Sequence, residues 1–550
     1  MLTTRTLWAL IVAVLVVPAS GQEAGRAQAS GGVLIPEQAC YDVRAYRLEL
    51  AVDPEKEQIE GVLTMRARAT ADTDTIVLDL DDALQVGKVE IPGHLLDAVH
   101  EDGRIRIPLT LKAGTDFKVS VTYGGKPRRA PNPPWQGGFT WAKTKDGKPW
   151  IATSCQGEGA DLWWPCKDHP SDKPETMDLF VTVPSGLVCA ANGHLVQAEP
   201  DPVHKVITYH WHIGVPISNY CVALNIAPYS VIERVYESTC GDKVPVQFFA
   251  LSEDRAQAEK ALPEFLDHLH HMEEVCGPYP FRGEKYGIAE TPHLGMEHQT
   301  IIAYGNKFRK REFDYDWLHH HEMSHEWWGN LVTCRDWKDM WIHEGIGTYM
   351  QGLYIESRRG RPQYLVQVGR WRRMLANQRA VAPRETMDSK QIYFGNSGND
   401  IYYKGACVLH TLRFLVGDDK FFVALRRLAY PDPALEKVTD GSCVRFEDTE
   451  GVRRILEEHT GMDLGWFFEV YLRQPALPTL MEARSGGKLT LRWLAPNDLA
   501  FPMPVPVKLG DRIERIEIVD GKGVVELDGQ EAEVDPEGWL LRAGGAGGRR

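Results

Sequence analysis

The chain has 550 residues, of which 43% are hydrophobic and 25% charged, and this composition is ordinary for a globular protein of three or four domains. The net charge of -14 argues against a nucleic-acid-binding surface, because such a surface needs a basic face. Ten cysteines without a CxxC pair exclude a disulfide scaffold and a zinc ribbon, and we expect most of them to be small buried residues, with one or two bridges left open.

The N-terminus is typical of a secretory signal peptide. Arg5 precedes an apolar run over 7–17, and small residues follow up to Gly21. The run is about half the length of a membrane-spanning helix, so cleavage after Gly21 is expected rather than a retained anchor. The sequence thus predicts a secreted or periplasmic protein with a signal peptide at 1–21, a flexible leader at 22–35, and no stable membrane insertion after cleavage.

Three patterned regions follow the leader and predict a multidomain α+β chain. Residues 36–232 contain short alternating segments such as 46–52, which predict an all-β domain. Residues 233–474 show helical spacing and predict a mainly helical domain. Strand patterns return over 475–542 and predict a small C-terminal β-sandwich, followed by a flexible tail at 543–550. The predicted helices are 252–276, 316–330, 344–358, 362–377, 404–416, 418–429, 450–459 and 464–472.

The helix over 316–330 contains the motif His321-Glu322-Met323-Ser324-His325. Positions i and i+4 share a helix face, so both imidazoles can reach one zinc ion. Glu322 lies beside the metal in this pattern and can take a proton from its bound water.

Glu344 supplies the third metal ligand in this interpretation. It stands at the start of the next predicted helix, after a break at Gly329-Asn330 that leaves room for a turn. Two histidines and one glutamate form a catalytic zinc site with an open fourth position, whereas a structural site would be closed by four ligands. The sequence therefore predicts one Zn²⁺ per chain, held by His321, His325 and Glu344.

Longer stretches resemble one family of metallopeptidases. The run from His321 through Thr333, then Trp337, Asp339 and 341–345, is similar to the aminopeptidase N family of gluzincins, which includes the leukotriene hydrolases. Matching segments also occur at 164–168, 217–220, 277–280 and 534–536, so the resemblance covers roughly 40–541. It implies a thermolysin-like central domain and aminopeptidase activity on peptides with a free N-terminus. Within this resemblance, we expect the chain to be a short form that lacks the large helical C-terminal domain of many relatives.

The resemblance also assigns substrate-binding residues. Gly295-Met296-Glu297 matches the family's exopeptidase motif, in which the glutamate binds the substrate's α-ammonium. Leu294 and His298 depart from the usual Gly and Asn of that motif, and we expect the Met296 side chain to pack. Gln156 falls where the family places a second amine-binding residue, with its amide oxygen as the acceptor.

The oxyanion stabiliser in this resemblance is Tyr402, in the sequence Tyr402-Tyr403-Lys404-Gly405. In the expected reaction Glu322 deprotonates water, the hydroxide attacks the scissile carbonyl, and Glu322 passes the proton to the leaving amine. His319 and His320 are expected to point away from the metal. Asp339 is expected either to orient a metal ligand or to begin a helix.

Three alternatives remain open at this point. A thermolysin-like endopeptidase shares the metal pattern but does not need Glu297. Epoxide hydrolysis in the leukotriene branch uses a second Tyr five residues before the oxyanion Tyr, where this chain has Ser397. A catalytically inactive peptide-binding protein would need to have lost a ligand or the base, and all of these residues are present.

Overall fold

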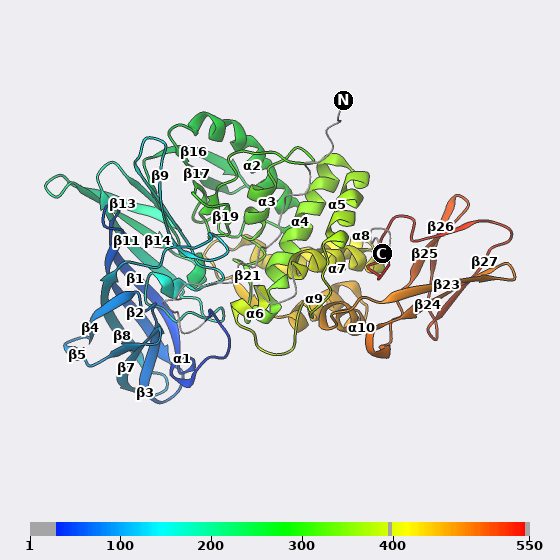
Figure 1. Cartoon of the computed structure of the whole chain (residues 1–550), viewed down its shortest axis with the longest axis horizontal. Coiled ribbons are helices and arrows are strands. Elements are labelled where there is room, and N and C mark those ends of the chain that lie inside the picture. The colour runs from blue at the N-terminus through cyan, green and yellow to red at the C-terminus, as the bar shows by residue number, and fades with distance from the viewer. Residues whose placement is uncertain (1–28, 394–398, 545–550) are drawn as a thin grey trace, which may run out of the picture.

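The computed structural model describes residues 29–393 and 399–544 and arranges them as three parts in a row (Figure 1). A β-rich part in blue and cyan lies at one side, a mainly helical part in green and yellow lies in the middle, and a small β part in orange and red lies at the other side. The predicted multidomain α+β fold class is therefore confirmed. The predicted signal peptide, leader residues 22–28, Ser397 and tail residues 545–550 lie outside the described residues. Over the two described ranges, no helix is both long and apolar enough to cross a bilayer.

The N-terminal part consists of three sheets. The largest has eight strands in the order β13-β14-β11-β1-β2-β8-β4-β5, and β1 pairs in parallel with β11 and antiparallel with β2. Smaller sheets have the orders β12-β15-β10-β9 and β3-β7-β6. Along β11, buried and half-buried residues alternate, as expected for a strand with one face on the core. The elements are α1 Pro36–Ala39, β1 Tyr41–Asp53, β2 Gln58–Ala69, β3 Thr73–Asp79, β4 Leu84–Ile91, β5 His94–Leu96, β6 Val99–Glu101, β7 Arg104–Leu111, β8 Asp116–Gly125, β9 Gly138–Lys143, β10 Pro149–Ser154, β11 Thr176–Pro184, β12 Val188–Ala191, β13 His194–Asp201, β14 Val206–Ile213 and β15 Leu224–Ala227.

The middle part combines a five-stranded mixed sheet and a small β21-β22 sheet with a group of helices. The five-stranded sheet has the order β16-β17-β18-β20-β19, and its first strand crosses the predicted domain boundary at 232/233. Because β16 pairs along its whole length with β17, it belongs to this sheet rather than to the preceding part. The strands are β16 Tyr229–Glu237, β17 Lys243–Leu251, β18 Tyr286–Glu290, β19 Gly295–Met296, β20 Ile302–Tyr304, β21 Val332–Cys334 and β22 Arg445–Glu447. The helices are α2 Arg255–Cys276, α3 Trp317–Ser324, α4 Trp341–Arg359, α5 Arg361–Arg373, α6 Ser389–Tyr393, α7 Asp400–Val416, α8 Asp418–Ala429, α9 Thr449–Thr460 and α10 Gly465–Phe468.

The C-terminal part has two three-stranded sheets, β23-β24-β27 and β26-β25-β28. It contacts the helices through Trp539, whose ring stacks on His410 of α7 at a centroid distance of 4.7 Å. The Thr411 hydroxyl also donates to the Trp539 carbonyl at 2.8 Å. The strands are β23 Thr479–Ser485, β24 Lys488–Leu494, β25 Val505–Leu509, β26 Arg512–Ile516, β27 Lys522–Glu526 and β28 Ala532–Val534.

Helix α3 is shorter than the sequence predicts. The predicted helix runs over 316–330, but α3 ends at Ser324 and His325 occupies the C-cap. Beyond it the backbone forms wider turns, in which the N–H of Asn330 bonds to the carbonyl of His325 at 2.9 Å. Gly329 then takes φ +143°, a conformation that side chains rarely adopt, and the chain turns toward β21.

Candidate metal centre

Three ligand atoms from α3 and α4 form a nearly equilateral triangle. Nε2 of His321 and Nε2 of His325 are 3.4 Å apart, and each lies 3.5 Å from Oε2 of Glu344. Tetrahedral ligands at about 2.0–2.1 Å from a zinc ion are separated by about 3.3–3.4 Å. Oε2 of Glu344 is also buried without a hydrogen-bond partner. The donor set, its spacing and this orphaned oxygen fit a zinc ion with one open position.

Glycines bring the helices of the site together. A Cβ on Gly405 of α7 would lie 2.8 Å from Cα of Gly345 on α4, so these two helices touch backbone to backbone. A Cβ on Gly347 would lie 2.9 Å from Oγ of Ser324, so α4 also lies close to the end of α3. The close approach places Glu344 beside the histidines of α3 and brings α7, which carries Tyr402, to the same place.

Neighbouring groups orient the metal ligands. Nδ1 of His325 contacts the Trp328 carbonyl at 2.9 Å, which leaves Nε2 for the metal. The Tyr393 hydroxyl donates to Oε1 of Glu344 at 2.9 Å. Burial raises the pKa of Glu344, but the close approach of His321 and the charge of His325 outweigh it and hold that pKa at about 2. Glu344 is therefore a carboxylate and can ligate a cation.

Glu322 lies against the backbone of β19. An added Cβ at Gly295 would lie 2.5 Å from Oε1 of Glu322, so only glycine leaves room for this carboxylate. Glu322 is 6% exposed, and burial followed by the charges of Glu297 and Glu344 raises its pKa well above the ordinary value. A glycine at position 295 is therefore favoured by the space that Glu322 needs, in addition to its place in the motif.

Glu297 lies next to the metal ligands and is bound from the N-terminal part. Oxygen atoms of Glu297 and Glu322 and a ring nitrogen of His325 all lie within 4.8 Å of one another. The Gln156 amide donates to Oε1 of Glu297, and the Tyr220 hydroxyl reaches the same oxygen at 3.2 Å. Burial raises the pKa of Glu297 to about 7. A buried carboxylate with fixed donors on one oxygen offers its other oxygen to a cationic ligand.

Of the two adjacent tyrosines on α7, Tyr402 is the one that lies beside a metal ligand. Its ring centroid lies 6.2 Å from that of His321. Burial, then the charges of Glu344 and Glu297, raise the pKa of Tyr402 well above the ordinary value, so its hydroxyl stays protonated and can donate. Tyr403 is its neighbour, with ring centroids 6.4 Å apart, and contacts no metal ligand among the described residues.

The other residues singled out in the sequence have packing roles. The His319 ring stacks on Phe265 at 3.8 Å, and Met296 is a buried core residue. His320 packs on Tyr354 with centroids 4.9 Å apart. The Thr449 hydroxyl donates to Asp339 at 2.6 Å, so this carboxylate ties the α4 entry to α9 and orients no metal ligand.

Two residues that contact the site are not predicted from the sequence. Tyr220 contacts Glu297, and Tyr393 contacts Glu344. Tyr220 lies inside a segment that marks the family resemblance, so that segment was the available signal for it. Tyr393 belongs to no motif, and only the fold brings it to α4.

Comparisons with known proteins indicate one family. The model of the peptidase M1 N-terminal domain matches residues 42–221, and the model of the peptidase family M1 domain matches residues 290–430. The two models, which describe one family, together match more than half of the chain.

Two fungal relatives and one solved structure are similar to the chain. Leucine aminopeptidase 2 of Aspergillus oryzae is 25% identical over 316 residues, which are 54% of this chain and 48% of that protein. Leucine aminopeptidase 2 of Neosartorya fischeri is 23% identical over 82% of this chain and 75% of its own length. The M1 zinc metallopeptidase of Deinococcus radiodurans has the same fold, with a TM-score of 0.64 at 24% identity, over 80% of this chain and 95% of that chain. The matched region therefore spans about half of the first relative.

Proposed function

The chain belongs to peptidase family M1, and we propose that it is a zinc-dependent aminopeptidase that removes the N-terminal residue from peptides. The observation that carries this proposal is the position of Glu297. Its carboxylate lies within 4.8 Å of both His325 and Glu322 and is held by two groups of the N-terminal part. A carboxylate so close to the metal pairs with the free α-ammonium of a peptide, so that the first peptide bond meets the metal.

The reaction uses residues with distinct tasks. His321, His325 and Glu344 would hold the zinc, which when bound acidifies a water and polarises a carbonyl. Glu322, held against Gly295, takes a proton from the attacking water and delivers it to the nitrogen of the leaving amine. The products are a free amino acid and a peptide shortened by one residue.

Two further groups act on the substrate. The Tyr402 hydroxyl donates to the oxygen on which negative charge develops, because its raised pKa keeps the proton in place. The Gln156 amide donates to Glu297 through its nitrogen, which leaves its oxygen to accept a hydrogen bond from the ammonium.

The alternative is a thermolysin-like endopeptidase, which would share the metal ligands and Glu322. Such an enzyme has no use for a buried carboxylate at the position of Glu297, where it would block a longer peptide and remain unpaired. The inactive peptide-binding alternative would have no need of Glu322 beside three intact ligands. The geometry of the site therefore supports both alternatives less well than an aminopeptidase.

Export is a separate part of the proposal. The basic start and apolar run before Gly21 support secretion or transport to the periplasm. N-terminal sequencing of the protein recovered outside the cytoplasm should begin at Gln22, whereas a chain recovered only from the cytoplasm with Met1 retained would contradict export.

Activity is tested with the zinc-loaded chain and aminoacyl arylamides. We expect release of the arylamine, loss of that release with a chelator, and recovery when zinc is added back. The Glu322→Gln variant should bind one zinc and release no arylamine above about 1% of the unaltered rate. A chain that binds zinc and cleaves no member of a broad aminoacyl panel would contradict the proposal.

A further inference from the structure

A cavity of about 280 Å³ lies away from the metal centre. It is formed by α2, the loop that precedes α3, and the last turn of α4. Glu344 stands in the first turn of α4 and Ile355 on the cavity wall eleven residues later, which is about 16 Å along a helix. The cavity is therefore separate from the site of the proposed reaction.

The floor of this cavity is apolar and aromatic. Tyr315, Tyr354 and Ile355 form a small buried cluster that is distinct from the main core, and Phe313 and Trp317 pack against it. Such a surface offers contact to one apolar or aromatic side chain. A cavity of this size accommodates a single amino acid.

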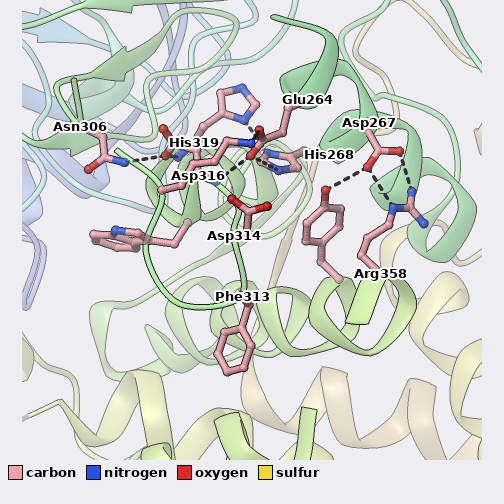
Figure 2. Close-up of polar contacts among 12 residues, drawn as sticks. Glu264, Asp267, His268, Asn306, Phe313, Asp314, Asp316, His319 and Arg358 are labelled. Atoms are coloured by element: carbon pink, nitrogen blue, oxygen red, sulfur yellow. Dashed lines mark hydrogen bonds and ion pairs between the residues drawn. The ribbon is translucent and has the colours of Figure 1, made fainter. Parts of the chain in front are cut away.

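The rim carries three acidic and three basic residues. Lys310 pairs with Glu264, Arg358 with Asp267 at 2.7 Å, and Arg359 with Asp314 at 3.4 Å. Figure 2 shows Asp267 and Arg358 turned toward each other from α2 and α4, with Phe313 and Asp314 on the loop beside them. Because the two signs are equal in number, the rim attracts no ion of one sign. It suits a ligand that carries both charges.

Of the three ion pairs on the rim, the one between Arg359 and Asp314 at the mouth of the cavity is the loosest. The side chains of Asp314 and Lys310 are 78% and 48% exposed, and the Arg359–Asp314 contact is long. Arg359 also donates to the Phe313 carbonyl at 2.9 Å, which holds the loop in place. Phe313 has φ 67°, a left-handed conformation that is strained for a bulky residue.

We propose that this cavity binds one free α-amino acid with an apolar or aromatic side chain. The ammonium pairs with the carboxylates of Asp314 and Glu264, the carboxylate pairs with Lys310 and Arg359, and the side chain lies on Tyr315 and Tyr354. A metal ion is a poorer occupant, because no set of donors at this cavity lies close enough to hold one among the described residues. The binding itself is independent of the proposed function, which adds only that the ligand is also a product.

The cavity is connected to the helix that carries the metal ligands. Oε1 of Glu264 accepts the backbone N–H of Asp316 at 2.8 Å. Asp316 in turn caps α3, because its Oδ1 accepts the N–H of His319 at 3.2 Å. A ligand that pairs with Glu264 therefore acts on the residue that begins α3.

Equilibrium dialysis of radiolabelled L-phenylalanine against the zinc-loaded chain tests the proposal. We expect two equivalents to bind: one at the metal centre, lost in Glu297→Gln, and one in the cavity, retained in Glu297→Gln. The double variant Lys310→Gln/Asp314→Asn removes one charge of each sign from the rim. It should weaken the affinity of the cavity for L-phenylalanine about tenfold or more. Lys145→Gln/Asp146→Asn, an equivalent change on an exposed turn of the N-terminal part, should have no effect.

Two further ligands show whether both charges are needed. N-acetyl-L-phenylalanine lacks the ammonium and phenethylamine lacks the carboxylate, so neither should displace the label from the cavity of Glu297→Gln. Displacement by either compound, or binding by Glu297→Gln that the rim variant leaves unchanged, would overturn the proposal. So would the absence of any bound label in Glu297→Gln. A wild-type chain that binds only the cavity equivalent would count against the proposed function and leave the cavity site supported.

Discussion

Helix α3 has two faces that carry the same residue type in different surroundings. His321, with His325 at the helix end, faces Glu344 across 3.5 Å and forms a ligand triangle. His319 and His320, its immediate neighbours, are fully buried against α2 and aromatic rings. Burial lowers the pKa of both well below the ordinary value, so both are neutral packing residues. Three consecutive histidines thus divide into one candidate metal ligand and two core residues, and the candidate ligand is the histidine that faces the carboxylate of Glu344 on the next helix.

Removing one histidine from each face of α3 tests this difference between the two faces most strongly. His321→Ala should lose the tightly bound zinc and essentially all peptidase activity, because a two-ligand site remains. His320→Ala should keep one zinc per folded chain and lose about 0.5–3 kcal/mol of unfolding free energy. The measurements are the zinc content, the peptidase activity and the denaturant unfolding of both variants. Loss of zinc from folded His320→Ala would contradict the assignment of the faces.

Glu322 lies on the same helix and should affect chemistry rather than metal binding. Glu322→Gln should lower kcat by about 10²–10⁴-fold, because the amide cannot accept the proton of the attacking water. Zinc stoichiometry should stay at one. A variant with near-normal kcat would mean that another group acts as the base.

The two adjacent tyrosines of α7 offer a second pair to compare. Tyr402→Phe should lower kcat about 10²-fold, since it removes one donor to the developing oxyanion. Tyr403→Phe should stay within about twofold, because Tyr403 contacts no metal ligand in the described part of the chain. Steady-state kinetics on one arylamide measure both variants, and equal losses would remove the oxyanion role from Tyr402.

Replacement of Tyr393 should have a smaller effect on kcat than replacement of His321, Glu322 or Tyr402. Tyr393→Phe removes the hydrogen bond to Oε1 of Glu344 and should weaken zinc binding about 10–100-fold. Activity at saturating zinc should largely recover, as expected of a positioning residue. The measurement is a zinc competition titration with a chelator of known affinity. A kcat defect that persists at saturating zinc would assign Tyr393 a direct part in the reaction.

The sequence predicts the ligand set because the ligands are regularly spaced. His321 and His325 share a face by helical periodicity, and Glu344 lies in the first turn of the next helix, which begins at Trp341, three residues before the predicted start. The end of α3 at Ser324 could not be predicted, because wide turns and Gly329 end the helix without a proline. The contacts of Tyr220 and Tyr393 join distant segments, and local patterns carry no signal for such pairs.

Domain limits were predicted less well than domain types. The change of the hydrophobic pattern from alternation to helical spacing predicts the start of the second part. The sequence of β16, however, has the pattern of one more strand of the first part. Its partner β17 is equally strand-like, and only the pairing of β17 with β18 joins both to the helical part.

The central claim is that Glu297 restricts the metal centre to free N-termini. The most direct measurement compares kcat/KM for an aminoacyl arylamide and its N-acetyl form, in the zinc-loaded chain and in Glu297→Gln. We expect at least about a 100-fold preference for the free amine in the unaltered chain, and a loss of that preference in Glu297→Gln. Glu290→Gln, which changes a buried carboxylate elsewhere in the same sheet, should keep the preference. Equal cleavage of both compounds by the unaltered chain would contradict the account and favour an endopeptidase.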